Sequence, residues 1–326
     1  MPDAGGGTGT SSEAPFVEGG VSFILSPDKL DITVKVTTSG GTSVTVEGCT
    51  VTTFTSDTET TLHAKDILVI LKGKITELKC YSNQLTELNV QGLTALQKLD
   101  CDKNQLTALD VQGLTALQYL TCSDNQLTSL NVQGSTALQG LFCRNNQLIE
   151  LNVQDLTALQ KLDCDKNQLT ALNVQSLTAL QSLACDWNQL TVLNVQGLTA
   201  LQELYCSGNQ LTALDVQGLT ALQELYCSGN QLTALDVQGL TALRYLGCWD
   251  NQLNADAFKK LFDDLPQRAD SDDANCILYT EQTGVTEGNH TDFTAPQDLK
   301  DAFNNAKNNK KWKMYKRNGS WPEVEI

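Results

Sequence analysis

The sequence has few of the residues that most often carry catalysis or bind polyanions. Its 326 residues include only 2 histidines, His63 and His290, and no nucleophile motif accompanies either of them. Lysine and arginine together number 22 against 38 aspartates and glutamates, which gives a formal net charge of −16. Because nucleic-acid binding needs a positively charged surface, we expect no nucleic-acid partner. We also expect no enzymatic activity and no cofactor.

Long apolar runs are absent as well. No stretch approaches the roughly 18 consecutive apolar residues of a membrane-spanning helix, so we expect no transmembrane segment. The chain opens on a polar segment rich in Gly and Ser, which predicts a flexible tether over residues 1–20. This opening lacks the positive region and apolar core of a signal peptide. We interpret it as the start of a mature fragment whose targeting peptide has been removed.

What the sequence has instead is a repeat. The phrase Cys-x-x-Asn-Gln-Leu occurs nine times, with its cysteines 21 residues apart from Cys80 to Cys248. Residues 198–218 and 219–239 are identical, so part of the array arose by duplication. A lone unit of this length cannot bury its apolar face, and the period therefore predicts nine stacked coils. The apolar positions of one complete unit are Leu96, Leu99, Cys101, Leu106, Leu109, Val111 and Leu114.

Two features of the unit predict its local structure. The short alternating stretch Leu99-x-Cys101 predicts a strand, and strands of successive coils would form a parallel sheet with a spacing of about 4.8 Å. Asn104 and its equivalents follow the strand, where an Asn side chain bonds to the backbone of a bend. We expect these asparagines to form a structural ladder. Ser135 replaces the leucine found at positions 93, 114 and 156, and it predicts a weaker edge there.

The unit resembles the leucine-rich-repeat superfamily, with Cys where the consensus has Leu. Its 21-residue length and its cysteine look like those of bacterial surface proteins related to internalin J, and the match covers residues 75–253. The resemblance implies a leucine-rich-repeat solenoid with a parallel β-sheet on its concave face and a ladder of stacked cysteines. It also implies an extracellular or cell-surface protein that contacts a host or neighbouring cell. A lipid anchor at the removed N-terminus is one means of attachment.

The ends of the array predict caps, because an open solenoid exposes its core. Alternating runs at 31–37, 43–47 and 67–71 indicate a β-rich N-terminal cap over residues 21–74. After the repeats of 75–253, residues 254–326 indicate an α/β C-terminal cap. It has a helix from Asn254 to Pro266, a strand at 276–280, a helix at about 296–307 and a strand at 312–315. The lysines and Arg317 near the end indicate either an anion site or a solvated surface, and the acidity of the chain favours the surface.

Several clusters are candidates for chemical sites. The stacked cysteines point the same way, which suits buried thiols better than disulfides or zinc. Cys49 and Cys276 lie at opposite ends and cannot pair with each other. Glu203 and Glu224 fall on neighbouring coils at the spacing of a glycosidase pair, but they derive from a copied repeat on an open face. Two aspartate pairs lack the ligands that calcium needs and indicate solvated charges: Asp100 with Asp102, and Asp163 with Asp165.

The aromatic residues carry the strongest functional signal. Leucines fill the core, so we place the aromatics of the repeats, Tyr81 included, beside the core positions of each strand, on the concave face, densest from Trp187 to Trp249. Exposed aromatics on one surface indicate binding, although they could instead only cover neighbouring strands. The predicted ligand-binding residues are Tyr119, Phe142, Arg144, Trp187, Tyr205, Tyr226, Tyr245 and Trp249.

These side chains favour recognition of a protein ligand, with Asp, Gln and Arg144 fixing the register. Carbohydrate binding is the first alternative, since Trp and Tyr also stack on sugar rings. A structural spacer that displays another part of the protein is the second. The sequence does not name the ligand.

Overall fold

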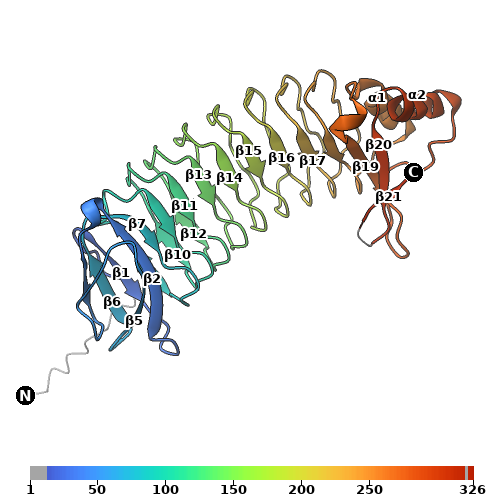
Figure 1. The fold of residues 1–326 in the computed structure, drawn as a ribbon. Helices are drawn as coiled ribbons and strands as arrows, with labels where there is room; N and C mark the ends of the chain where they lie inside the picture. The colour runs from blue at the N-terminus through green and yellow to red at the C-terminus, as the bar shows by residue number, and fades with distance from the viewer. Residues whose placement is uncertain (1–12, 320–321) are drawn as a thin grey trace, which may run out of the picture. The chain divides into compact units, whose positions relative to one another are not determined.

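The computed structural model describes residues 13–319 and 322–326. The chain divides into two compact units, Met1–Ser135 and Thr136–Ile326, and each contains part of the repeat array (Figure 1). Both units are built on the parallel strands of a leucine-rich-repeat solenoid, as the 21-residue period predicts. Among the described residues, no helix is both long enough and apolar enough to cross a membrane.

The first unit begins with two β-sheets that precede most of the repeats. The strands expected at 31–37, 43–47 and 67–71 are present, with small shifts at their ends. One sheet has the order β4 (Thr53–Phe54), β3 (Val44–Glu47), β6 (Leu68–Lys72), β1 (Gly20–Ile24) and β8 (Glu87–Asn89). In the other, β2 (Asp31–Thr38) lies antiparallel between β5 (Glu59–His63) and β7 (Ile75–Lys79), and the 3-10 turn η1 (Ser39–Gly41) follows β2.

The repeats of the first unit continue from β7. The strands β7, β9 (Lys98–Asp100) and β11 (Tyr119–Thr121) are parallel, and their central leucines are in register: Leu78, Leu99 and Leu120. A second short parallel pair, β10 (Ala108–Asp110) and β12 (Ser129–Asn131), lies elsewhere on the same coils. On each strand the central leucine is buried, so the residues on either side of it form the outer surface of the sheet, here called the sheet face.

The second unit contains the other coils and the C-terminal segment. Its strands are parallel and in register at 21-residue spacing through the repeats, so equivalent residues of consecutive coils lie side by side. The antiparallel β21 (Val324–Glu325) ends the sheet. The parallel strands are β13 (Gly140–Phe142), β14 (Lys161–Asp163), β15 (Ser182–Ala184), β16 (Glu203–Tyr205), β17 (Glu224–Tyr226), β18 (Tyr245–Gly247), β19 (Asn275–Thr280) and β20 (Lys313–Arg317).

The asparagine of each repeat closes the bend after the strand. Asn188 is buried, and its amide nitrogen donates to the carbonyl oxygens of Cys164 and Cys185 at 3.0 and 3.2 Å. Its side-chain oxygen accepts from the backbone N–H of Leu169 at 3.0 Å. One side chain therefore satisfies backbone groups of two coils, which is how a buried bend avoids unpaired polar groups. The predicted asparagine ladder is confirmed.

The cysteines of the repeats are buried and form no disulfide. Burial raises the pKa of these thiols, for example that of Cys185, so they remain protonated and pack as small apolar groups. Cys276 lies outside this series, as the sequence indicates, because it is the register partner of Leu246 on β18. Its thiol is close to that of Cys248, and this neighbour, with burial, raises the pKa of Cys248. The column of thiols therefore ends at Cys248, and Cys276 occupies the leucine position on the next strand.

Ser135, at the edge that the sequence predicts to be weaker, makes a polar contact inside the core. The side chain is fully buried, and its hydroxyl donates to the carbonyl oxygen of Val111 at 2.7 Å. A polar group in the core costs little when it is hydrogen-bonded, and here the bond links two coils of the first unit. The serine thus replaces apolar packing by a specific contact.

The C-terminal segment folds as the sequence predicts. Asn254 caps α1 (Ala255–Asp264) by accepting from the N–H of Ala257, and the helix ends two residues before Pro266. The helix α2 (Gln297–Asn308) packs on α1, and four rings form one cluster between them: Phe258, Phe262, Phe293 and Phe303. A 3-10 turn, η2 (Asp270–Asp272), precedes β19.

The start of the chain differs in part from the flexible tether expected over residues 1–20. Residues 1–12 lie outside the described residues. Ala14 and Val17 are buried, and the Asn89 side chain donates to the carbonyl oxygen of Ala14 at 3.0 Å. Residues 13–20 therefore pack against the first repeat.

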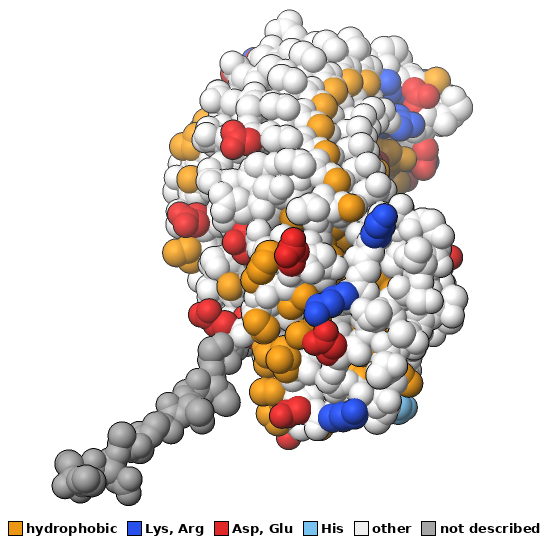
Figure 2. All heavy atoms as spheres, turned by 90° about the vertical axis from the view of Figure 1, so that its left-hand side faces the viewer, with side chains coloured by type: hydrophobic (Ala, Val, Ile, Leu, Met, Phe, Trp, Pro, Cys, Tyr) orange, Lys and Arg blue, Asp and Glu red, His pale blue; other side chains and the backbone are white. Residues whose placement is uncertain are grey.

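On the face seen in Figure 2, described side chains of both charge signs are interspersed among hydrophobic ones, without a broad field of one sign.

Candidate functional site: an aromatic recess on the sheet face

The structure brings together half of the predicted binding residues and separates the others. Trp187, Tyr205, Tyr226 and Trp249 line one cavity of about 390 Å³ on the second unit. Tyr245 lines a neighbouring cavity of about 560 Å³, which shares Tyr226, Trp249 and Arg317 with the first. The remaining three predicted residues, Tyr119, Phe142 and Arg144, do not line either cavity.

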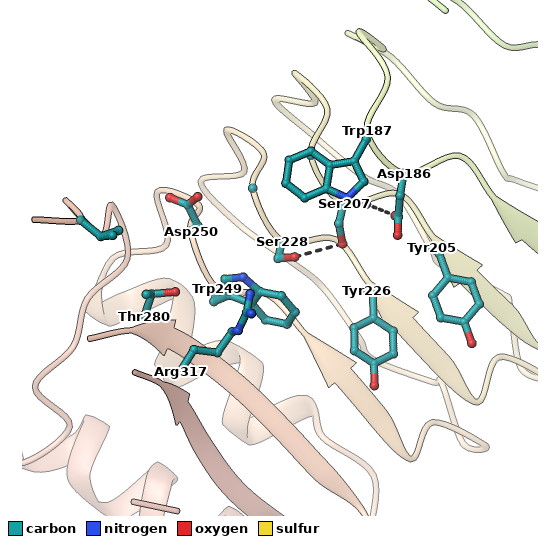
Figure 3. Close-up of a pocket in the computed structure, with 13 residues that line it drawn as sticks. Asp186, Trp187, Tyr205, Ser207, Tyr226, Ser228, Trp249, Asp250, Thr280 and Arg317 are labelled. Carbon is teal, nitrogen blue, oxygen red and sulfur yellow. Dashed lines mark hydrogen bonds between the residues drawn. The ribbon is translucent and has the colours of Figure 1, made fainter. Parts of the chain in front are cut away.

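Register places the rings of consecutive coils beside one another. Tyr205 and Tyr226 are partners in the pairing of β16 with β17, and their rings stack at 5.5 Å between centroids. Tyr226 meets the edge of Trp249 at 6.4 Å. The guanidinium of Arg317, at the end of β20, lies 4.8 Å above the Trp249 ring in a cation–π contact. The rings therefore form a continuous row that ends at a positive charge (Figure 3).

Trp187 occupies a different position from the one the sequence predicted. It was placed beside the core positions of the strand, but it lies one residue further, in the bend, with a left-handed backbone (φ 55°). Its side chain is 63% exposed. A Cβ atom on Gly208 of the next coil would lie only 2.8 Å from the indole, so the glycine leaves the space that the ring occupies.

Two glycines create the recess. In the array, the position just before the ladder asparagine has a left-handed backbone, and Gly208 and Gly229 are the glycines found there. The other coils carry a side chain at this position: Ser82, Lys103, Asp124, Asn145, Lys166, Trp187 and Asp250. The two glycines are flanked by Trp187 on one side and Asp250 on the other. We call the space between the Trp187 and Trp249 indoles, over these glycines, the indole recess (Figure 3).

The floor of the indole recess is polar. Ser207 and Ser228 are buried, and their hydroxyls are 3.0 Å apart in a hydrogen bond. The N–H of Ser207 donates to the Asp186 carboxylate at 2.5 Å. Burial, with the nearby Asp165 carboxylate, raises the pKa of Asp186 to about 7 even though this N–H favours the ionised form. Asp186 therefore titrates near neutral pH.

The rings of Tyr226 and Trp249 are half-buried, whereas the sequence led us to expect exposed side chains. A Cβ atom on Gly247 would lie 2.6 Å from both rings, which shows how closely they fill the space above that glycine. Tyr205 is held from the other side, since its hydroxyl donates to the Glu224 carboxylate at 2.5 Å. The row therefore keeps a partly exposed surface and also packs as a cluster over the neighbouring strands.

The sequence reasoning missed the residues that complete the recess. Arg317, Thr280 and Val285 belong to the C-terminal segment, and no repeat pattern indicates that they reach the last coils. Gly208 and Gly229 did carry a signal, because aligning the repeats shows glycine where the other coils have a side chain. In the sequence, the two glycines indicate the position of the recess better than the aromatic residues do.

The basic residues near the C-terminus form contacts within their own segment. Lys313 pairs with Asp273, and Lys316 lies 2.5 Å from Glu281. Lys310 donates to the carbonyl oxygen of Phe262 at 3.0 Å, and Arg317 covers Trp249. These contacts favour the interpretation of a cap surface over that of an anion site.

Two of the four paired aspartates, Asp102 and Asp165, are not the solvated charges that the sequence suggested. Asp165 is part-buried, and its carboxylate accepts from the N–H of Asp186 at 2.7 Å. Burial raises the pKa of Asp165 to about 6, and Asp102 in the first unit behaves in the same way. No group of three or more potential metal ligands occurs among the described residues. Glu203 and Glu224 are register partners, on an open strand surface.

Comparisons with known proteins agree with this fold. The family described as Leucine Rich repeats (2 copies) matches residues 199–237. A search of curated proteins gave no match. Among solved structures, a leucine-rich-repeat protein of Leptospira interrogans has 23% identity and a TM-score of 0.51 over 74% of this chain and 66% of its own. YopM, a leucine-rich effector protein of Yersinia pestis, has 26% identity and a TM-score of 0.52 over 63% and 54%.

The functional domain of InlJ from Listeria monocytogenes, which includes a cysteine ladder, shares 31% identity over 67% of this chain, with a TM-score of 0.49. This chain spans 52% of the InlJ chain and 66% of the Leptospira chain. The sequence period, the register of the strands and the matched family lead to one assignment. The chain is a leucine-rich-repeat protein.

Proposed function

We propose that this protein is a non-catalytic binding protein that recognises a protein ligand through the sheet face of its second unit. The observation that carries the proposal is the row formed by Tyr205, Tyr226 and Trp249 beside the indole recess. Large rings with few rotatable bonds lose little entropy on binding, and Trp, Tyr and Arg are enriched among residues that dominate interface energetics. We include Tyr119, Phe142, Arg144 and Tyr245 as peripheral contacts.

Carbohydrate binding is the second candidate, and the ring geometry disfavours it. A sugar ring stacks on the open face of an aromatic side chain. The faces of Tyr205 and Tyr226 lie against each other, and Arg317 covers one face of Trp249. Among the aromatic side chains that line the recess, Trp187, at 63% exposed, is the one that presents most of its ring to solvent. A protein ligand can instead use ring edges, the serine hydroxyls and the recess together.

The wider setting follows from the same proposal. Internalin-like and YopM-like proteins suggest a protein that acts outside the cell that makes it, so we propose an extracellular or cell-surface location, with a lipid anchor as one means of attachment. We also propose the division into a β-rich cap (21–74), nine repeats (75–253) and a C-terminal cap (254–326). The contact surface would then lie at the end of the array next to the C-terminal cap.

A peptide library displayed on phage tests the proposal without knowledge of the natural ligand. The full chain is used for selection, and the recovered peptides are tested against Tyr226→Ala and Trp249→Ala. We expect each variant to lose about 2 kcal/mol of binding free energy, the usual cost at an interface hot spot. Gln217→Ala and Gln238→Ala, exposed residues of the repeats outside the recess, should bind as the wild type does.

Three results would contradict this function. Selected peptides that bind all four variants equally would place the ligand elsewhere on the chain. Failure to select any peptide, together with binding to a glycan array that Trp187→Ala abolishes, would favour carbohydrate recognition. A chain that binds neither kind of ligand would be a structural spacer.

A further inference from the structure

The indole recess differs from the rest of the aromatic row in being an open space between two indoles with carboxylates at its rim. We propose that it receives a cationic side chain, lysine or arginine, from the partner protein. This inference rests on the proposed protein-binding function and specifies the chemistry of one contact within it. Three independent features carry it: the charges around the recess, the exposed indole and the missing side chains.

The charge around the recess is predominantly negative. Asp250 is exposed at one rim, and Asp186 lies at the opposite side. Behind Asp250, the Glu287 carboxylate accepts from the N–H groups of Asp250 and Thr280, at 2.9 and 2.6 Å, so it is fixed near the rim. Arg317 is the cation among the lining residues, and it is already engaged with Trp249. A chain of net charge −16 adds a long-range attraction for basic partners.

The aromatic side chains suit a cation. An indole attracts a positive charge to its face, and Arg317 shows this within the molecule, with its guanidinium 4.8 Å from the Trp249 ring centre. Trp187, on the other side of the recess, is 63% exposed, and no cation lies over it in the described part of the chain. A lysine or arginine entering the recess would meet this indole and the Asp250 carboxylate together.

The repeat array itself shows what kind of group fits the space. Lys103 and Lys166 occupy the position of Gly229 in other coils, with the same left-handed backbone. Between Trp187 and Asp250 the array omits this side chain from two consecutive coils. The Trp187 indole occupies the space above Gly208. Above Gly229, the nearest side-chain atom to an added Cβ atom is Asp250 Oδ2 at 4.0 Å, so this part of the recess has room for a long side chain supplied from outside. An acidic segment would be repelled by Asp250 and Glu287, which leaves a basic segment as the complementary occupant.

Single capped amino acids test this chemistry on the full chain. Nuclear magnetic resonance follows the indole N–H signals of Trp187 and Trp249 during titration with N-acetyl-arginine amide, with its lysine and glutamine counterparts, and with methyl glucoside. We expect saturable shifts with arginine and lysine, and about tenfold weaker binding of the neutral glutamine compound, as loss of a cation–π contact implies. Equal response to the glutamine compound, or a response to the sugar alone, would overturn the inference.

Matched glycine variants locate the binding. Gly229→Asn restores a side chain that other coils carry, and asparagine tolerates the left-handed backbone (φ 61°). We expect this variant to lose the arginine-induced shift. Gly218→Asn should keep it, because Gly218 is another positive-φ glycine and a Cβ atom there would have no neighbour within 4 Å. Trp187→Ala, which leaves both glycines in place, should weaken the binding of the capped arginine about tenfold. An arginine response that survives both Gly229→Asn and Trp187→Ala would overturn the inference.

The two proposals fail in different ways. If phage selection yields peptides that depend on Tyr226 and Trp249 but contain no basic residue, and the capped arginine gives no shift, the protein-binding function stands and the cationic contact is wrong. If the capped arginine binds but no peptide depends on the aromatic row, the recess takes a cation and the proposed interface is wrong.

Discussion

The sheet face of the first unit and that of the last coils of the second unit carry different chemistry on the same scaffold. In the first unit, Lys98 on β9 forms an ion pair of 2.9 Å with Glu77 on β7, and both side chains are partly exposed. In the second unit, the corresponding strands carry Tyr205 and Tyr226 in a stack, with a recess beside them. An exposed ion pair contributes little to stability or to binding, whereas a row of rings offers apolar area.

The buried residues do not share this difference. Leu99 in the first unit and Leu204 in the second are both buried, and each lies close in sequence to a buried cysteine of the thiol column. The comparison teaches that the repeat separates two tasks. Leucine, cysteine and asparagine specify the coil, and the exposed residues between them differ from coil to coil without changing the fold. Changes in the first group should therefore affect stability, and changes in the second should affect mainly binding.

The largest expected effect comes from placing a charge in the shared core. Leu162 on β14 is 1% exposed, and Leu162→Asp would bury a carboxylate without a partner, at a cost of about 3 to 5 kcal/mol in the free energy of unfolding. Urea denaturation followed by circular dichroism measures this loss. Val192→Asp, at a side chain that is 71% exposed in the same unit, is the control and should change stability by less than about 0.5 kcal/mol. Equal stability of the two variants would mean that the core assignment is wrong.

The difference between positions that specify the coil and positions that vary also explains how much of the structure the sequence could predict. The fold followed from Cys80 to Cys248 at a constant spacing, because a period fixes which side chains share a core. The helix at Ala255–Asp264 followed from its own apolar spacing and the cap at Asn254. These are local or periodic signals. The recess was not predicted: Gly208 and Gly229 stand out when the repeats are aligned, but nothing in the sequence indicates that Arg317 and Val285 approach these coils.

The sequence also did not predict how exposed each aromatic ring is. Alternation along a strand indicated that Tyr226 faces outward. It did not indicate that the rings of Tyr205 and Trp249 would cover Tyr226, or that the Tyr226 ring would fill the space above Gly247. Such contacts depend on which side chains stand at the same position of the neighbouring coils. Trp187 was placed one residue too early, because the bend after the cysteine turns its side chain toward Gly208.

A smaller loss of stability is expected when an aromatic ring is removed, and it should be larger for a packed ring than for a more exposed one. Tyr226 is half-buried in the aromatic row, while Tyr119 of the first unit is 40% exposed. We expect Tyr226→Ala to lower the free energy of unfolding by about 1 to 2 kcal/mol, since a stacked pair adds to the area that the ring buries. Tyr119→Ala should cost about 0.5 kcal/mol. Thermal and urea unfolding of both variants would decide, and an equal cost would contradict the distinction between the two faces.

The last expected effect is a change in the pH dependence of stability. Burial and the Asp165 carboxylate raise the pKa of Asp186 to about 7, from an ordinary value of 3.8. Between these values the folded chain binds more protons than the unfolded chain, so the contribution of Asp186 to stability is present at low pH and is lost as pH rises toward 7. Asp186→Asn keeps an oxygen that can accept from Ser207 and removes the titration. We expect its stability relative to the wild type to increase from about pH 4 to about pH 8, with the linkage changed by about one proton.

Urea denaturation at several pH values measures this difference, and Asp155→Asn is the control, because it removes an exposed carboxylate of the same unit. If Asp186→Asn and the wild type show parallel stability profiles, the carboxyl group is as well solvated in the folded chain as in the unfolded one, and the polar floor of the recess is more open to water than the contacts of Ser207 and Ser228 imply. If the profiles diverge as expected, this face of the second unit contains a carboxyl group that changes charge near neutral pH beside the recess. The aromatic face would then differ from the ion-paired face of the first unit in its response to protons as well as in its rings.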